Sequence, residues 1–215
     1  MVTGATPLRV AGAARRADSL EHRLLDAAMA LGERWGFAKV TVDDIAAAAG
    51  VSRATLYRIF PGGKDVLFDA LRVRHLEEYF SRLTAELEGV DDLEEFLVRA
   101  VVASTLELRG DRHLAVMLAT EPGEALGQLT VGGLPRIVRM ATTFLAPLVV
   151  RFLPRPDAAR LVDVVARLVI SYFLAPSDHV DLGDPESARP FLATSVIPAF
   201  VPPPALAGRP HQEHT

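Results

Sequence analysis

Apolar residues recur every three or four positions along most of the chain, the spacing that places them on one face of an α-helix. The first such segment carries an apolar stripe from Leu20 to Trp35 and stops at Gly36. A longer segment runs from Asp65 to Glu88, which predicts a helix about 35 Å long at a rise of about 1.5 Å per residue. No stretch alternates apolar and polar positions as a half-buried strand would. The pattern therefore predicts an all-α protein.

The later periodic segments predict shorter helices. Glycine and proline separate or interrupt them, with Gly89 before the first, Gly110 at its end and Pro147 inside a later one, which we expect to be kinked there. The expected helices cover residues 91–110, 112–121, 123–130, 135–154, 157–175 and 184–197.

The stretch from Thr41 to Lys64 predicts two short helices joined by a tight turn. Thr41 can cap the first helix while Asp44, three residues on, reaches back to it in a capping box. Gly50 falls where the chain must reverse, since glycine adopts the left-handed conformation cheaply, and Ser52 can cap the second helix. A small apolar core is expected from Ile45, Ala49, Val51, Leu56 and Phe60.

The face of the second helix that points away from Leu56 is small and polar. Ala54 and Arg58 lie on it, with Arg53, Thr55 and Tyr57 on its flanks. Arginine suits guanine edges or phosphate, whereas tyrosine and threonine suit phosphate. Such a face suits a helix that enters the major groove of DNA.

Over residues 19–71 the chain resembles the DNA-binding domain of the TetR (tetracycline-repressor) family of bacterial transcription regulators. The resemblance rests on T-V-D-D-I-A, A-G-V-S, T-L-Y and F-P at these spacings, preceded by L-L-D-A-A-M-A-L-G-E-R-W-G-F. It implies a helix-turn-helix DNA-binding domain at residues 18–64 and a helical effector-binding and dimerisation domain at residues 65–201. The DNA-contacting residues that it implies are Thr41, Ser52, Arg53, Ala54, Thr55, Tyr57, Arg58 and Lys64.

Two positions depart from the family pattern. The loop that ends at Lys64 has one residue more between its phenylalanine and its lysine than the commonest form of the family. Asp43 stands where other members carry a DNA-contacting basic residue. We interpret Asp43 as a first-turn carboxylate favoured by the helix dipole, not as a DNA contact.

The ends of the chain show no sustained periodicity. We expect a mobile arm at residues 1–17 and a disordered tail at residues 202–215. The charges of the arm are Arg9, Arg15 and Arg16, and two interpretations stay open for them: contact with the DNA backbone or minor groove, or a solvated tail.

Charge is distributed unevenly along the chain. Up to His75, 11 Lys and Arg oppose 8 Asp and Glu, a net +3, whereas the remainder carries 12 against 19, a net −7, and the whole chain −4. A basic head on an acidic body is typical of DNA binding, because phosphate neutralisation dominates affinity.

Composition argues against several classes of protein. The chain has no cysteine, which excludes disulfides, thiolate catalysis and cysteine-bound zinc and fits a reducing cytoplasm. No apolar run reaches the roughly 18 residues of a membrane span, and no signal-peptide core follows the first arginines. No H-E-x-x-H, G-x-S-x-G or G-x-G-x-x-G motif occurs. We therefore expect a cytoplasmic protein that is not an enzyme and needs no cofactor or metal.

The body offers apolar side chains for an effector pocket. Its candidate lining residues are Phe96, His113, Met117, Met140, Phe144 and Tyr172. Few charges lie between them, so a ligand would be hydrophobic or amphipathic. The alternative is that each residue is packed core, and then a protein partner would take the place of the small molecule.

The last two expected helices carry more apolar residues than one face of a monomer needs. The surplus comprises Leu161, Val164, Val165, Leu168, Phe173 and Phe191. A four-helix contact between two copies would bury it, as the family resemblance also implies. The resemblance thus implies a homodimeric regulator, usually a repressor, that binds a palindromic operator.

Overall fold

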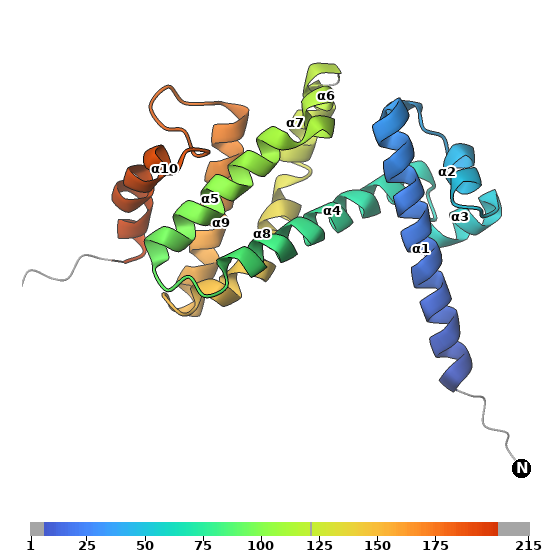
Figure 1. The fold of residues 1–215 in the computed structure, drawn as a ribbon, viewed down its shortest axis with the longest axis horizontal. Coiled ribbons are helices and arrows are strands. Elements are labelled where there is room, and N and C mark those ends of the chain that lie inside the picture. Colours follow the sequence, from blue (N-terminus) through green and yellow to red (C-terminus); the bar gives the residue numbers. More distant parts are fainter. Residues whose placement is uncertain (1–6, 121, 202–215) are drawn as a thin grey trace, which may run out of the picture. The chain divides into compact units, whose positions relative to one another are not determined.

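The computed structural model describes residues 7–120 and 122–201. Ten α-helices and no strand occur in this part of the chain, so the all-α prediction is confirmed. The chain forms two compact units, residues 1–76 and residues 77–215, and helix α4 (Lys64–Leu87) contributes to both (Figure 1). The expected disordered tail at residues 202–215 lies outside the described part.

The first unit begins with helix α1 (Pro7–Trp35), which starts well before the predicted position near Asp18. Residues 7–17, which we expected to form an arm without regular structure, are therefore helical, while residues 1–6 lie outside the described part. The reason is local, because Pro7 suits a first helical position and the alanines and arginines that follow are strong helix formers. A 3₁₀ turn, η1 (Phe37–Lys39), follows Gly36.

Helices α2 (Val42–Ala48) and α3 (Arg53–Ile59) complete the first unit with the start of α4. Leu67, Phe68 and Leu71 of α4 are buried in its core. The basic head predicted from the sequence corresponds to the first unit. This unit extends into α4 and ends near residue 76, not at residue 64 as the sequence suggested. The other buried residues of this core are Leu24, Leu25, Ala28, Val40, Ile45, Ala46, Ala49, Leu56 and Phe60.

The second unit contains the end of α4 and six further helices. These are α5 (Leu93–Gly110), α6 (Arg112–Thr120), α7 (Pro122–Leu129), α8 (Leu134–Val149), α9 (Arg155–Leu174) and α10 (Pro185–Phe191). A short π-helix, η2 (Leu192–Val196), and a short 3₁₀-helix, η3 (Ile197–Ala199), follow α10. Each helix lies close to its predicted position, but α8 ends before Pro154 because the chain turns there and buries Leu153.

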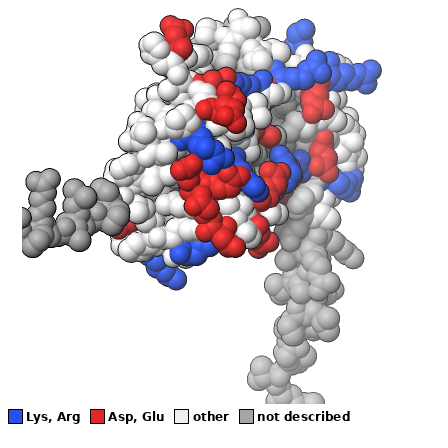
Figure 2. Space-filling view, turned by 60° about the vertical axis from the view of Figure 1, so that its left-hand side comes forward, with Lys and Arg blue, Asp and Glu red and all other residues white. Residues whose placement is uncertain are grey.

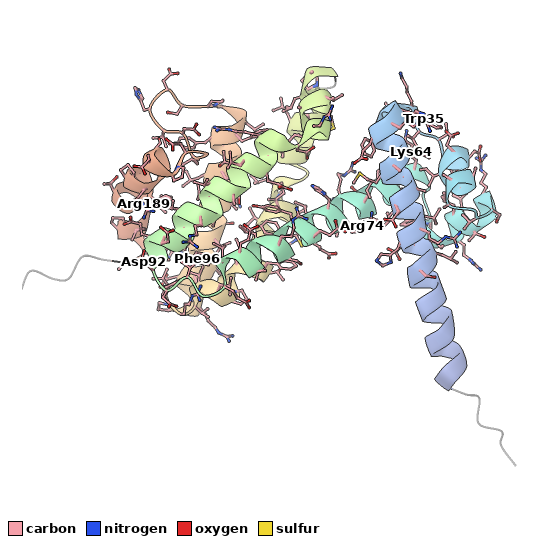
Figure 3. The ribbon with its side chains drawn as sticks, viewed as in Figure 1. Trp35, Lys64, Arg74, Asp92, Phe96 and Arg189 are labelled. Carbon is pink, nitrogen blue, oxygen red and sulfur yellow. The ribbon has the colours of Figure 1, made fainter. Side chains whose placement is uncertain are left out.

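Helix α8 packs along α9, and α5 packs against α9 and α10. Arg189 of α10 pairs with Glu94 and Glu95 near the start of α5, where Asp92 and Phe96 also lie (Figure 3). Arg189 and then Arg99 lower the pKa of the Glu95 carboxyl. Acidic and basic side chains are interleaved on the surface in Figure 2, as expected for a surface that carries such pairs.

None of the helices in the described ranges has both the length and the apolar character that a membrane crossing requires.

Candidate nucleic-acid interface

Thr41 and Asp44 form the predicted capping box at the start of α2. The Asp44 backbone N–H donates to Thr41 Oγ1 at 3.2 Å, and the Thr41 backbone N–H donates to Asp44 Oδ2 at 3.0 Å. The Thr41 hydroxyl also donates to Asp44 Oδ2 at 2.5 Å. This side-chain hydrogen bond, followed by the backbone one, lowers the pKa of Asp44. The proton of the Thr41 hydroxyl is thus engaged within the cap, and a phosphate contact by it would replace that hydrogen bond.

Gly50 forms the turn between α2 and α3, as predicted, with a φ of 64°. Its N–H donates to the Ala47 carbonyl at 3.1 Å, and the Val51 N–H donates to the Ala46 carbonyl at 2.9 Å. From α1, Arg23 donates a hydrogen bond to the Ala49 carbonyl. The turn is therefore held both by its own backbone and by the first helix.

Ser52 caps α3, since its hydroxyl accepts a hydrogen bond from the Thr55 N–H at 3.1 Å. Its Oγ also lies 2.9 Å from Thr55 Oγ1. Leu56 is completely buried, as predicted. On the other side of α3 the side chains are exposed to solvent, namely Arg53, Ala54, Tyr57 and Arg58.

Arg53 is held by two neighbours on this face. Its Nη1 lies 3.2 Å from Asp43 Oδ1 and 3.1 Å from Asp43 Oδ2. Its guanidinium carbon lies 5.6 Å from the centre of the Tyr57 ring. The Tyr57 hydroxyl and then the Asp43 carboxylate raise the pKa of Arg53.

The Asp43–Arg53 pair is the feature of the interface that the sequence did not reveal. Asp43 does lie in the first turn of α2, as predicted, but it also reaches a side chain of α3. The two residues stand ten positions apart in sequence. Only the crossing of α2 and α3 brings them together, so no local pattern could have indicated the contact.

The loop between α3 and α4 depends on its two glycines. Gly62 and Gly63 have φ values of 119° and 71°. A Cβ at Gly63 would come within 3.0 Å of Tyr57 Cε1, so the ring lies directly against the loop. Gly63 therefore lies beside α3, against the ring of Tyr57.

Lys64 and Arg58 differ in their contacts. Lys64, at the start of α4 (Figure 3), donates to the Ala38 carbonyl at 3.0 Å, and its Nζ lies 5.4 Å from the Phe68 ring centre. Arg58 makes no hydrogen bond or ion pair with the residues that the structure describes. Arg58 is thus the more available of the two cations.

Two of the expected pocket residues are packed against other aromatic rings of the second unit. Phe96 is completely buried, and its ring centroid lies 6.0 Å from that of Phe152. Phe144 of α8 stacks on Phe80 of α4 with centroids 6.1 Å apart. Both therefore contribute to core packing in the structure.

The other expected pocket residues lie elsewhere in the second unit. Tyr172 packs against Phe191, with centroids 5.5 Å apart. Met117 packs on a buried cluster of Leu114, Leu129 and Ile170, and Met140 is half-buried. The side chain of His113 lies outside the described part.

The expected dimer surface on α9 needs a correction. Leu161 is completely buried within one chain and Val165 is 8% exposed, on a helix that packs against both α8 and α5. These two residues have almost no surface left for a partner. Val164 keeps 38% of its surface exposed, and Leu168 and Phe173 are half-buried.

The described residues contain no group of three or more His, Asp or Glu side chains placed to hold a metal ion.

Comparison with known proteins relates this architecture to transcription regulators. Residues 24–71 match the model of the family described as bacterial regulatory proteins, tetR family. Over 201 residues the chain is 31% identical to an HTH-type transcriptional regulator of Mycobacterium tuberculosis, covering 90% of this chain and 92% of the relative.

Two crystal structures share the fold. The TetR family repressor AlkX from Dietzia sp., implicated in biodegradation of n-alkanes, superposes with a TM-score of 0.61 at 22% identity, over 80% of this chain and 95% of that one. The multidrug binding protein EbrR, complexed with imidazole, gives a TM-score of 0.54 at 23% identity, over 87% of this chain and 98% of that one.

Proposed function

Because the chain belongs to the TetR family of bacterial transcription regulators, we propose that it is a repressor that binds a palindromic operator as a homodimer. The observation that carries the proposal is the exposed face of α3, opposite the buried Leu56. A short helix with such a face fits the major groove. Two symmetric heads would read inverted half-sites, which makes the operator palindromic.

In this proposal Arg53 and Arg58 contact base edges. An arginine fork matches the O6 and N7 acceptors of guanine, and Arg58 has no competing partner among the described residues. The other predicted DNA-contacting residues lie along the phosphates or contribute to the shape of the surface that faces the DNA. They are Thr41, Ser52, Ala54, Thr55, Tyr57 and Lys64.

We propose that a small apolar or amphipathic molecule releases the repressor from DNA. The aromatic and methionine side chains of the second unit would favour such a ligand. Helix α4 contributes Leu67 to the core of the first unit and Phe80 to that of the second. A ligand would act by preferring one conformation of this shared helix, because equal affinity for both conformations shifts nothing.

A second candidate is a regulator controlled by a protein partner. The packing of Phe96 against Phe152 and of Phe144 against Phe80 favours it, since side chains that fill the core leave less room for a ligand. The DNA-binding part of the proposal is the same in both cases.

The test begins with selection of bound duplexes from a random library by the wild-type protein. A palindromic consensus is the expected result, and selection of no sequence would refute the proposal. Apolar compounds are then titrated by calorimetry with and without the selected operator. An effector should bind roughly 5- to 150-fold more weakly when operator is present, a coupling of about 1 to 3 kcal/mol. Compounds that bind equally well in both titrations would leave the protein partner as the better candidate.

A further inference from the structure

Three side chains from two helices form a cluster on the exposed surface of the head. They are Asp43, from the first turn of α2, and Arg53 and Tyr57, from α3. The carboxylate and the guanidinium are both well exposed, with 65% and 61% of their side-chain surface accessible. A role for this cluster in DNA recognition rests on the proposed function.

The contact with Asp43 leaves Arg53 able to bind DNA. A single guanidinium nitrogen, Nη1, lies within hydrogen-bond distance of the two carboxylate oxygens. A guanidinium carries five N–H donors in a fixed fork, so donors remain for a base edge. With Asp43 at Nη1 and the Tyr57 ring 5.6 Å from the guanidinium carbon, the side chain is held before DNA arrives. Such preorganisation lowers the entropy that binding costs.

The charge of Asp43 also affects which DNA binds well. An unpaired arginine attracts any phosphate, and that attraction is the same for every sequence. The Asp43 carboxylate offsets part of this attraction and itself repels phosphate. A guanine edge is less affected, because it is read by directional hydrogen bonds and not by net charge. The pair therefore weakens non-specific binding more than it weakens base recognition.

We propose that Asp43 is a specificity-determining residue, which holds Arg53 for a guanine edge and suppresses its contact with phosphate. The competing explanation is that Asp43 only stabilises the first turn of α2 through the helix dipole. Asp65 provides a matched control, because it is likewise an exposed acidic residue in the first turn of a helix of the head. No ion pair joins it to a described residue.

The experiment measures the affinity of wild type, Asp43→Asn and Asp65→Asn for two duplexes, the one selected from the library and one of unrelated sequence, over a range of salt. Asp43→Asn should bind the unrelated duplex more tightly, with a salt slope steeper by up to about one unit. The ratio of specific to non-specific affinity should fall roughly 2- to 5-fold, the scale of one exposed ion pair. Asp65→Asn should leave that ratio unchanged.

Two further variants separate a base contact from a general effect of charge. In an Arg53→Ala background, Asp43→Asn should no longer change the ratio. Arg53→Lys keeps the positive charge but lacks the guanidinium fork, so its ratio of specific to non-specific affinity should also fall. This variant provides a second test if circular dichroism shows that Asp43→Asn is poorly folded. An unchanged ratio in a folded Asp43→Asn or in Arg53→Lys, or an effect of Asp43→Asn that survives without Arg53, would overturn the inference.

This result is distinguishable from failure of the proposed function. If the wild-type protein selects no sequence, then both fail. If it selects an operator and the Asp43 variant keeps the wild-type ratio, then only the role of Asp43 fails.

Discussion

The residues of α3 and of its N-cap have separate roles although they lie in one short segment. Leu56 fills the core of the head, while Ser52 satisfies the Thr55 N–H at the start of the helix. Arg53 and Arg58 point to the exposed side, one paired with Asp43 and the other without a partner in the described part. The two arginines should therefore behave differently when they are removed.

Replacing Arg53 or Arg58 by alanine should weaken operator binding. If the side chain makes a bidentate base contact, the loss should be about 1 to 3 kcal/mol, and the preference should relax at one position of each half-site. The measurement is a titration of each variant against the operator and its single-base changes. Arg72→Ala is the control, since Arg72 lies on α4 and pairs with Asp69.

The pattern of the losses identifies the contact. A uniform loss across all sequences would assign the arginine to phosphate. Unchanged affinity in both variants would show that the wrong face of α3 has been chosen. Because Arg53 leaves Asp43 unpaired when it is removed, its loss should exceed that of Arg58 for equivalent base contacts.

At the scale of elements, the helix-turn-helix depends on Gly50. Its φ of 64° is a conformation that costs a residue with a side chain about 1 to 2 kcal/mol. A Cβ there would also lie 3.2 Å from Nη2 of Arg23, the guanidinium that contacts the end of α2. The orientation of α3 relative to α2 is therefore sensitive to this position.

Gly50→Ala should lower the free energy of unfolding by about 1 to 2 kcal/mol. Chemical denaturation followed by circular dichroism measures this change. Gly110→Ala is a suitable control, because Gly110 lies in α5 without a positive φ and with open space around its Cβ position. That change should be neutral or stabilise by up to about 1 kcal/mol. Equal effects of the two substitutions would contradict the role assigned to the turn.

At the scale of the whole molecule, the unequal exposure along α9 divides its apolar residues into two groups. Leu161 is buried by its own chain, whereas Val164 retains 38% of its surface. If two copies associate through this helix, then Val164 should matter for association and Leu161 for folding. Exposed valines elsewhere should matter for neither, and Val131, which is 91% exposed, offers the comparison.

Sedimentation of the wild-type protein at micromolar concentration should show a dimer. Val164→Arg should shift it to a monomer with unchanged helicity, because a charge would be buried without a partner. Leu161→Ala should cost about 2 to 5 kcal/mol of stability, as large cavities in a core do. Val131→Arg should remain dimeric. A wild-type monomer, or a Val164→Arg dimer, would refute the proposed use of α9.

The sequence by itself determined the features that depend on near neighbours. The Thr41–Asp44 cap, the Gly50 turn and the Ser52 cap were all predictable, because each involves residues at most a few positions apart. The all-α class followed in the same way from the period of the apolar residues. Local chemistry was also enough to predict which side of α3 is buried at Leu56 and which side is exposed to solvent.

Tertiary structure decided what covers each surface. Periodicity marks Leu161 and Val164 alike as apolar, but only the packing of other helices on α9 shows that one is buried and the other is not. The contact of Asp43 with Arg53 likewise depends on how α2 and α3 cross. Such contacts arise between residues far apart along the chain, so their energies depend on a geometry that no local pattern of residues contains.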